Sequence, residues 1–315
     1  MSDVRTPGKA SLFLAATLIW GSTWLAIKYQ LGVVAPEVSV AYRFALAAAM
    51  LAAWCALTGR SLRFGRREHA FIALQGALLF GLNYVGVYWA EQHATSGLVA
   101  VLFSTIVFMN PIGARLVFGT PLGARMLFAA ALGVTGVALL FLPELGQARA
   151  GGDAALGIVF GLGATAIASA GNLTAVRNQQ AGIPLLQSNA WAMLYGAVVA
   201  AVAATVHGVT WNFDPRAGYV LSLLYLAAFG SVIAFYAYLT LMQKVGPTRS
   251  SYVGIAVPVV ALALSTLFEG YRWTWIAVLG VVLAVVANWI ALRPTQTQAQ
   301  PGPADGRRKA DARAV

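Results

Sequence analysis

Ten apolar stretches limit what this chain can fold into. A helix needs about 20 mostly apolar residues to cross the hydrocarbon core of a bilayer. The stretches cover residues 10–29, 37–57, 70–90, 95–116, 124–142, 154–176, 184–206, 218–242, 247–268 and 273–292. The sequence therefore predicts an all-α polytopic membrane protein with ten transmembrane helices.

The composition excludes the soluble alternatives. Apolar residues make up 59% of the 315 residues and charged residues 10%, whereas a soluble domain carries about 25% charged residues. A soluble fold of this length could not bury so much apolar surface, and disorder requires low hydrophobicity. The net charge of +11 comes from short basic clusters between the apolar stretches, so we expect no nucleic-acid partner. The single cysteine, Cys55, excludes an intramolecular disulfide.

The 21 lysine and arginine residues predict the orientation in the membrane. With a cytoplasmic N-terminus, 16 of them fall in cytoplasmic segments, four in outer segments and Arg43 alone within a span. Lysine and arginine are enriched in short cytoplasmic loops. We therefore predict a multi-pass membrane protein with both termini in the cytoplasm.

Recurring residues divide the chain into two halves of five spans each. Five residues recur at offsets of 147 to 150 residues, namely Gly21 as Gly171, Gly81 as Gly230, Pro111 as Pro258, Arg125 as Arg272 and Gly133 as Gly280. Because five is odd, the second half must enter the membrane in the opposite sense. The predicted fold is thus a 5+5 inverted repeat around a central cavity, an organisation that many secondary transporters use.

These features predict five segments along the chain. They are a cytoplasmic N-terminus (1–9), a first repeat (10–142), a linker (143–153), a second repeat (154–293) and a disordered cytoplasmic tail (294–315).

Two motifs resemble a known family. The stretch LIWGSTW, residues 18–24, resembles the opening of the EamA branch of the drug/metabolite transporter superfamily. The pattern Pro111-x21-Gly133-x2-Gly136-Val137 is similar to the signature that closes each repeat of that family. Its counterpart in the second half, Pro258-x21-Gly280, matches less well. The acidic residue that often follows this proline is present there as Glu269, whereas Gly119-Thr120-Pro121 replaces it in the first half.

The resemblance covers residues 10–293 and has consequences for fold and function. It implies that the first, third, fourth, sixth, eighth and ninth helices surround a central cavity. It also implies export or uptake of small metabolites, among which amino acids are prominent for bacterial members.

The spans carry few ionisable groups. All ten acidic residues and all three histidines lie outside the spans or at span ends, so no carboxylate is expected at mid-membrane depth. Proton and sodium sites in transporters usually use buried Asp, Glu or His, and enzymes need a nucleophile, paired carboxylates or metal ligands. We therefore expect no enzyme activity, no cofactor and no metal. Any coupling must use Glu37, Glu91 or backbone oxygens, and we expect transport mainly down the substrate's own gradient.

Arg43 lies about 9 Å inside the outer end of the second span, and two interpretations remain open. Its long side chain could snorkel to the outer headgroups. Alternatively, it could face the cavity and pair with a substrate carboxylate. Only the second interpretation predicts that replacing Arg43 weakens transport.

Polar and aromatic residues concentrate in the spans predicted to surround the cavity. The candidate cavity-lining residues are Trp20, Thr23, Trp24, Arg43, Asn83, Tyr84, Tyr88, Thr105, Asn110, Asn172, Tyr236, Tyr238 and Tyr252. Such residues can also bond neighbouring helices without binding a ligand. Pro111 and Pro258 remove backbone hydrogen bonds and can kink the fourth and ninth spans, either as gates or as static bends.

These residues favour a transporter for small amphipathic metabolites, above all neutral or aromatic amino acids, that works by alternating access. Aromatic walls with few charges suit such a solute, whereas a phosphorylated sugar would require more than one buried cation. A carrier or efflux pump for another metabolite or drug is the alternative within transport, and a non-transporting receptor or scaffold is the alternative from another class. A monomer is sufficient for this function, and the sequence does not determine the oligomeric state.

Overall fold

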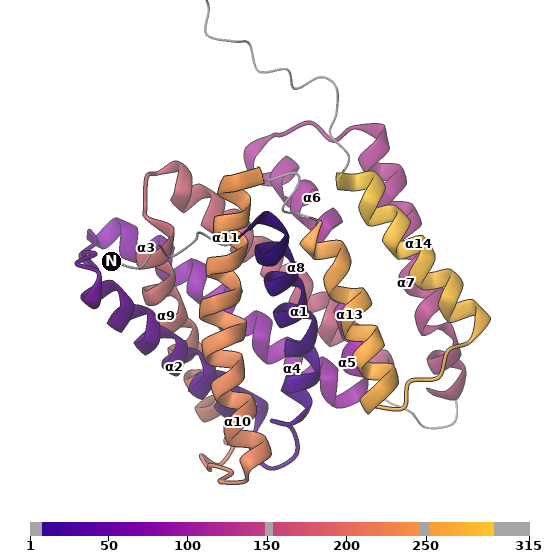
Figure 1. Cartoon of the computed structure of the whole chain (residues 1–315), viewed down its shortest axis with the longest axis horizontal. Helices are drawn as coiled ribbons and strands as arrows, with labels where there is room; N and C mark the ends of the chain where they lie inside the picture. The colour runs from indigo at the N-terminus through magenta and orange to yellow at the C-terminus, as the bar shows by residue number, and fades with distance from the viewer. Residues whose placement is uncertain (1–7, 149–153, 246–251, 293–315) are drawn as a thin grey trace, which may run out of the picture.

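The computed structural model describes residues 8–148, 154–245 and 252–292, and every regular element in these ranges is helical (Figure 1). The first half contains α1 (Lys9–Lys28), α2 (Pro36–Leu57), α3 (Arg66–Gly76), η1 (Ala77–Leu82), α4 (Asn83–His93), α5 (Ser96–Phe103), α6 (Ile106–Phe118) and α7 (Ala124–Ala148). The second half contains α8 (Ala154–Gln180), α9 (Leu185–Val206), α10 (Ala217–Tyr225), η2 (Leu226–Ile233), α11 (Ala234–Val245), α13 (Val253–Phe268) and α14 (Trp275–Leu292), where η marks a π-helical segment.

The predicted spans agree with these helices. Within the described ranges, nine helices are long and apolar enough to cross a bilayer. The ninth predicted span, 247–268, is represented by α13, which has 16 residues, and residues 247–251 lie outside the described ranges. The helix α7 continues to Ala148, into the stretch that the sequence analysis assigned to the linker.

Two π-helical segments lie at related positions in the two halves. The segment η1 joins α3 to α4, and η2 joins α10 to α11. They begin at Ala77 and Leu226, which are 149 residues apart, the same offset that relates Gly81 in η1 to Gly230 in η2. Short π segments inside α-helices frequently mark functional sites. The two halves therefore share a backbone irregularity as well as residues.

Helices of the first half pack against helices of the second half. The helix α2 lies along α9, α4 along α8 and α7 along α14, and the last pair runs down one side of the bundle in Figure 1. A Cβ atom on Gly136 would lie 2.7 Å from the Gly280 carbonyl oxygen, and one on Gly280 would lie 2.6 Å from the Gly136 carbonyl oxygen. Only glycine fits at this crossing, as expected where membrane helices approach closely.

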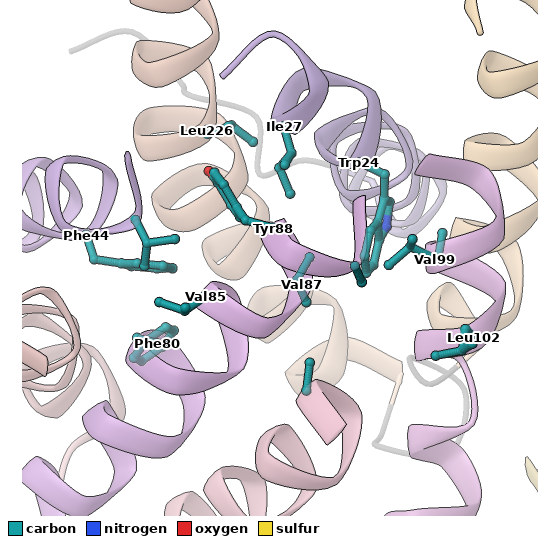
Figure 2. Close-up of a cluster of buried hydrophobic side chains, with 14 of the residues drawn as sticks. Trp24, Ile27, Phe44, Phe80, Val85, Val87, Tyr88, Val99, Leu102 and Leu226 are labelled. Atoms are coloured by element: carbon teal, nitrogen blue, oxygen red, sulfur yellow. The ribbon is translucent and has the colours of Figure 1, made fainter. Parts of the chain in front are cut away.

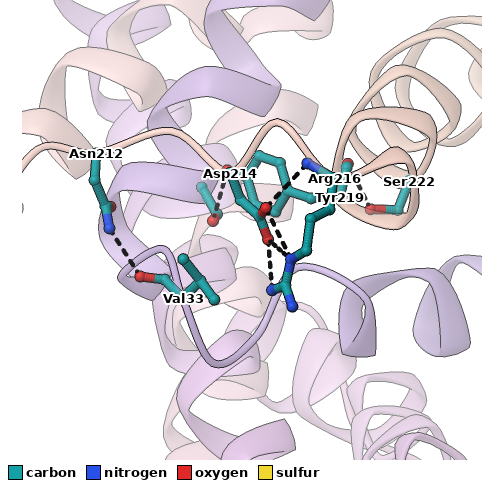
Figure 3. A network of polar contacts seen from close by, with 7 residues as sticks. Val33, Asn212, Asp214, Arg216, Tyr219 and Ser222 are labelled. Carbon is teal, nitrogen blue, oxygen red and sulfur yellow. Dashed lines mark hydrogen bonds and ion pairs between the residues drawn. The ribbon is translucent and has the colours of Figure 1, made fainter.

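The connections at one end of the bundle are held by polar contacts (Figure 3). The side chain of Asn212, between α9 and α10, donates to the Val33 carbonyl between α1 and α2 at 2.9 Å. Arg216 donates to both carboxylate oxygens of Asp214, and its Nη2 lies 2.7 Å from Oδ2. The carboxylate of Glu37, at the start of α2, lies 2.8 Å from Nδ1 of His207, at the end of α9. The Asn212–Val33 and Glu37–His207 contacts tie the first half of the chain to the second.

Buried apolar residues from both halves form the centre of the bundle (Figure 2). Trp24 comes from α1, Phe44 from α2, Phe80 from η1 and Leu226 from η2. Tyr88 of α4 lies among them with 0% of its surface exposed, and its hydroxyl extends toward Leu226 in Figure 2. A buried hydroxyl needs a hydrogen-bond partner, and the partners of Tyr88 define a polar site in this core.

Candidate functional site

Arg43 of α2 is completely surrounded by the bundle, with 1% of its surface exposed. Its guanidinium carbon lies 4.5 Å from the ring centroid of Tyr84 and 5.1 Å from that of Phe44, a cation–π arrangement. The Nε and Nη1 atoms have no hydrogen-bond partner. Snorkelling requires the guanidinium to reach the surface, so that interpretation does not describe this structure.

A glycine in η2 makes room for Arg43. A Cβ atom on Gly230 would lie 2.8 Å from Cγ2 of Thr23 and 3.6 Å from Nη2 of Arg43. The indole of Trp20 donates to the Gly230 carbonyl at 3.1 Å. The helices α1 and α2 thus meet η2 at a position where a side chain would collide.

Tyr88 lies beside Gln30, which follows the end of α1, and near Arg43. The Tyr88 hydroxyl donates to Oε1 of Gln30 at 2.6 Å, and Arg43 interacts electrostatically with Tyr88. Gln30 is 1% exposed, and its Nε2 has no hydrogen-bond partner. The amide of Gln30 and the guanidinium of Arg43 therefore present unused N–H donors around one tyrosine.

Glu91 is buried next to an ionic contact that does not involve its carboxylate. The Lys28 ammonium donates to the backbone carbonyl of Glu91 and, at 2.7 Å, to that of Ala94, and it lies 3.8 Å from Oε1 of Glu269. The carboxylate of Glu269 in turn accepts hydrogen bonds from the backbone N–H and the hydroxyl of Ser96. Glu91 itself is 0% exposed, and neither of its carboxylate oxygens has a hydrogen-bond partner.

We call Gln30, Arg43, Tyr84, Tyr88 and Glu91 the central cluster, and the end of the bundle that contains Lys28 and Glu91 the Glu91 end. Both Arg43 and Glu91 interact electrostatically with Tyr88, but no ion pair joins them in the described part of the chain. The central cluster therefore offers donors to an anionic group and acceptors to a cationic one.

A second polar group lies toward the opposite end. Gln75 of α3 donates to Oδ1 of Asn189 at 3.0 Å, and Asn178 of α8 donates to Oε1 of Gln75 at 3.0 Å. Asn178 also donates to the Phe71 carbonyl at 3.3 Å and accepts a bond from Arg177 at 3.2 Å. We call Gln75, Asn178 and Asn189 the amide network. It joins α3 to α8 and α9, and the sequence did not reveal it.

Several predicted cavity residues pack between helices. The Thr23 hydroxyl donates to the Trp20 carbonyl at 2.7 Å. The Trp20 ring contacts that of Tyr238 at 5.2 Å, and the Trp24 ring contacts that of Phe103 at 5.4 Å. These residues behave as the helix-packing alternative predicts, although Trp20 and Thr23 border the glycine beside Arg43.

The remaining polar candidates are dispersed. The Asn83 amide donates to the Leu79 carbonyl at 3.0 Å and the Thr105 hydroxyl to that of Leu102 at 2.7 Å. Asn110 has a buried amide oxygen without a partner, and Asn172 is half-buried.

Two tyrosines that were predicted to line the cavity lie apart from the central cluster. Tyr236 is 57% exposed, because it lies on a different face of α11 from Tyr238. Tyr252 is half-buried and immediately precedes α13.

The two prolines lie inside helices, Pro111 in α6 and Pro258 in α13. Pro258 is buried, and with Ser104 and Asn288 it lines a cavity of about 10 Å³, which is room for about one water molecule. A larger hollow of about 320 Å³ is lined by residues of the α1–α2 and α9–α10 connections and by Gln92. None of the predicted cavity residues lines this larger hollow.

Sequence reasoning missed Gln30 and underestimated Glu91. Glu91 lies two residues before the end of α4, as expected for a carboxylate at a span end. Its burial depends on residues from other helices, and no local pattern reports those contacts. Lys28 shares a helical stripe with Trp24, so its inward direction could have been inferred.

The EamA-like transporter family matches the chain twice, over residues 9–142 and 155–293. The chain belongs to the EamA-like transporter family. It is therefore a membrane transporter, which implies a small-molecule substrate and a lipid bilayer.

Similar members of this family include named bacterial proteins. The inner membrane transporter YedA of Escherichia coli K12 is 30% identical over 278 residues, which cover 86% of this chain and 87% of YedA. Protein PagO of Salmonella typhimurium is 22% identical, covering 89% of this chain and 91% of PagO. One solved crystal structure is similar to this chain, with 19% sequence identity and a TM-score of 0.64. The match covers 90% of this chain and 96% of the solved chain. That likeness shows that this chain has the fold of a solved structure.

Proposed function

We propose that this EamA-like transporter exports small amphipathic metabolites, with neutral or aromatic amino acids as the favoured substrates. The observation that carries the proposal is the buried guanidinium of Arg43, which lies over Tyr84 and has unused N–H groups. A guanidinium binds a carboxylate through two parallel hydrogen bonds. The neighbouring rings offer apolar walls to a side chain.

The balance of buried charge supports this substrate class. In the central cluster Arg43 is the one cation, and Glu91 is the one carboxyl group. A multiply charged phosphate would need more cations than the cluster offers. A solute with one carboxylate and an apolar side chain matches it better.

We further propose that transport proceeds by alternating access between two inverted halves, 10–142 and 154–293, in the inner membrane with both termini in the cytoplasm. The two family matches support a duplication, as do the π segments that begin 149 residues apart. An odd number of spans in each half requires opposite orientations. Reporter fusions that place the C-terminus outside the cytoplasm would contradict this topology.

The test is transport in proteoliposomes that contain the purified protein. Labelled phenylalanine and leucine should leave vesicles that contain the protein faster than they leave protein-free vesicles. The substitution Arg43→Leu should slow this efflux while the protein remains folded. Efflux of neither amino acid would contradict the proposal. Efflux of an unrelated drug or metabolite instead would favour the alternative carrier, and no transport of any solute would favour a receptor or scaffold.

A further inference from the structure

The carboxylate of Glu91 lacks the partner that its burial requires. Taking a carboxylate out of water is costly unless a cation or hydrogen-bond donors compensate it. Both oxygens of Glu91 are buried and unpartnered, and the side chain lies between helices rather than at a surface. The group that compensates this charge must therefore come from elsewhere.

The nearest ammonium is already occupied. A lysine ammonium has three N–H donors. In Lys28 these face the carbonyls of Glu91 and Ala94 and the carboxylate of Glu269. Glu269 is itself fixed by hydrogen bonds from Ser96. Lys28 thus closes the Glu91 end of the bundle and leaves the Glu91 carboxylate available.

Unused donors lie close to the same tyrosine. Nε and Nη1 of Arg43 and Nε2 of Gln30 are buried without acceptors. The Tyr88 hydroxyl bonds to Gln30, and Arg43 acts electrostatically on both Tyr88 and Glu91. Unsatisfied donors and unsatisfied acceptors therefore lie near one another around Tyr88.

We propose that Glu91 binds the ammonium group of the substrate while Arg43 and Gln30 bind its carboxylate, so that the site selects a zwitterionic α-amino acid over a simple carboxylate or amine. This inference rests on the function proposed above and adds the residue that recognises the amine. In an α-amino acid one carbon separates the two charged groups, so recognition needs a guanidinium and a carboxylate that lie near each other, as Arg43 and Glu91 do around Tyr88. The side chain of the substrate then lies against the ring of Tyr84.

A hollow of about 320 Å³ lies at the Glu91 end of the bundle. Its lining includes Gln92, next to Glu91, and Gly32, two residues after Gln30. The central cluster therefore lies near a hollow in sequence, although its own residues do not line that hollow.

The experiment compares phenylalanine with 3-phenylpropionate, which lacks the amine, and with phenethylamine, which lacks the carboxylate. Proteoliposomes carry the wild type, Glu91→Gln, Arg43→Gln or the control Glu68→Gln. The control makes the same substitution at a half-buried carboxylate in the first turn of α3, which accepts a bond from the Gly65 N–H and lies outside the central cluster. Thermal stabilisation by each compound in detergent measures binding independently of transport.

We expect Glu91→Gln to lower phenylalanine transport about tenfold or more, since hydrogen bonds to charged groups are worth about that much. Transport of 3-phenylpropionate should not fall, so the variant should lose the preference for phenylalanine over 3-phenylpropionate. Arg43→Gln should lower transport of both carboxylates and spare phenethylamine. Glu68→Gln should behave as the wild type.

Equal losses for phenylalanine and 3-phenylpropionate in Glu91→Gln, or no loss for either, would overturn the inference while leaving amino-acid export intact. A wild-type protein that transports none of the compounds would overturn the proposed function and this inference with it. If Glu91→Gln does not fold, the wild type alone still decides. Phenylalanine must stabilise the wild type at concentrations about tenfold lower than those that 3-phenylpropionate requires. Equal stabilisation at the same concentration would refute the role of Glu91.

Discussion

The two ends of the bundle bury polar groups in opposite ways. Toward one end, the amide network is neutral, and Gln75, Asn178 and Asn189 satisfy one another across three helices. Toward the other, the central cluster contains Arg43 and Glu91, whose polar atoms remain partly unpaired. Gln75 and Glu91 lie on one continuous helical run, about 24 Å apart along its axis.

The difference separates residues that stabilise the fold from residues available to a ligand. A complete buried hydrogen-bond network specifies and rigidifies a packing arrangement. Unpaired buried charges destabilise the protein that contains them, and such costs are characteristic of functional sites. Changes in the amide network should therefore affect stability, and changes in the central cluster should affect transport.

The largest effect is expected at Arg43. Replacing Arg43 with methionine should slow amino-acid transport about 10- to 100-fold, because hydrogen bonds to a charged group are lost. The unfolding temperature should stay the same or rise, since an unpaired buried charge is removed. Efflux assays and thermal unfolding of the same preparation measure both quantities.

The control for this variant is Arg63→Met, at an exposed position between α2 and α3. It should change neither quantity. A large fall in the unfolding temperature of Arg43→Met together with normal transport would reverse the assignment and make Arg43 a structural residue.

The next largest effect is expected in the amide network. Asn178→Leu removes the donor to the Gln75 side chain and the second donor to the Phe71 carbonyl, and an unsatisfied buried acceptor costs about 1–3 kcal/mol. Thermal unfolding in detergent should show a lower midpoint, while folded molecules keep their preference among substrates. Gln179→Leu, at an exposed position on the same helix, should leave the midpoint unchanged. A stable Asn178→Leu with altered substrate preference would contradict the comparison.

A smaller effect is expected at Gly230. Alanine there would bring Cβ to 2.8 Å from Cγ2 of Thr23, and overpacking of this kind costs about 1–3 kcal/mol, toward the lower end for one methyl group. Adding Thr23→Ala should restore part of the stability. Gly254→Ala, where no atom lies within 4 Å of the added Cβ, should be neutral or stabilising. Equal unfolding midpoints for the two alanine variants would refute the close approach.

The smallest effect is expected in the connection between α9 and α10. Hydrogen bonds from Arg216 lower the pKa of Asp214. The stabilisation by this pair is therefore complete above the pKa of an unfolded aspartate, about 3.9, and is lost as the pH falls through the lowered folded value. Arg216→Gln should raise the Asp214 pKa in a carboxyl NMR titration without changing transport at neutral pH. An unchanged titration would show that the pair does not form.

The sequence predicted the helices well and the site only in part. Hydropathy sets helix positions locally, and the boundaries of α2 and α9 differ from the predictions by one residue at most. Arg43, Tyr84 and Tyr88 were predicted and come together. Gln30 was not predicted because it follows the end of α1, outside any periodic pattern.

Other differences have a physical cause of the same kind. Tyr236 and Tyr238 are two positions apart on α11, so they cannot face the same side of a helix, and only Tyr238 contacts Trp20. The π segments depend on contacts between helices, which composition does not encode. Burial of Glu91 likewise depends on which distant segments cover it, and hydropathy treats every glutamate alike.

The π-helical turn η1 sets the direction in which every later side chain of the third span points. Successive residues of an α-helix are turned by about 100°, and Tyr84, Tyr88 and Glu91 all lie downstream of Ala77–Leu82. Restoring regular α geometry in that turn without removing a residue would rotate all three by about this angle relative to the preceding helix. Such a change would turn Tyr84 away from Arg43 while preserving every residue of the proposed site, so the geometry of one turn matters to that site as much as the side chains themselves.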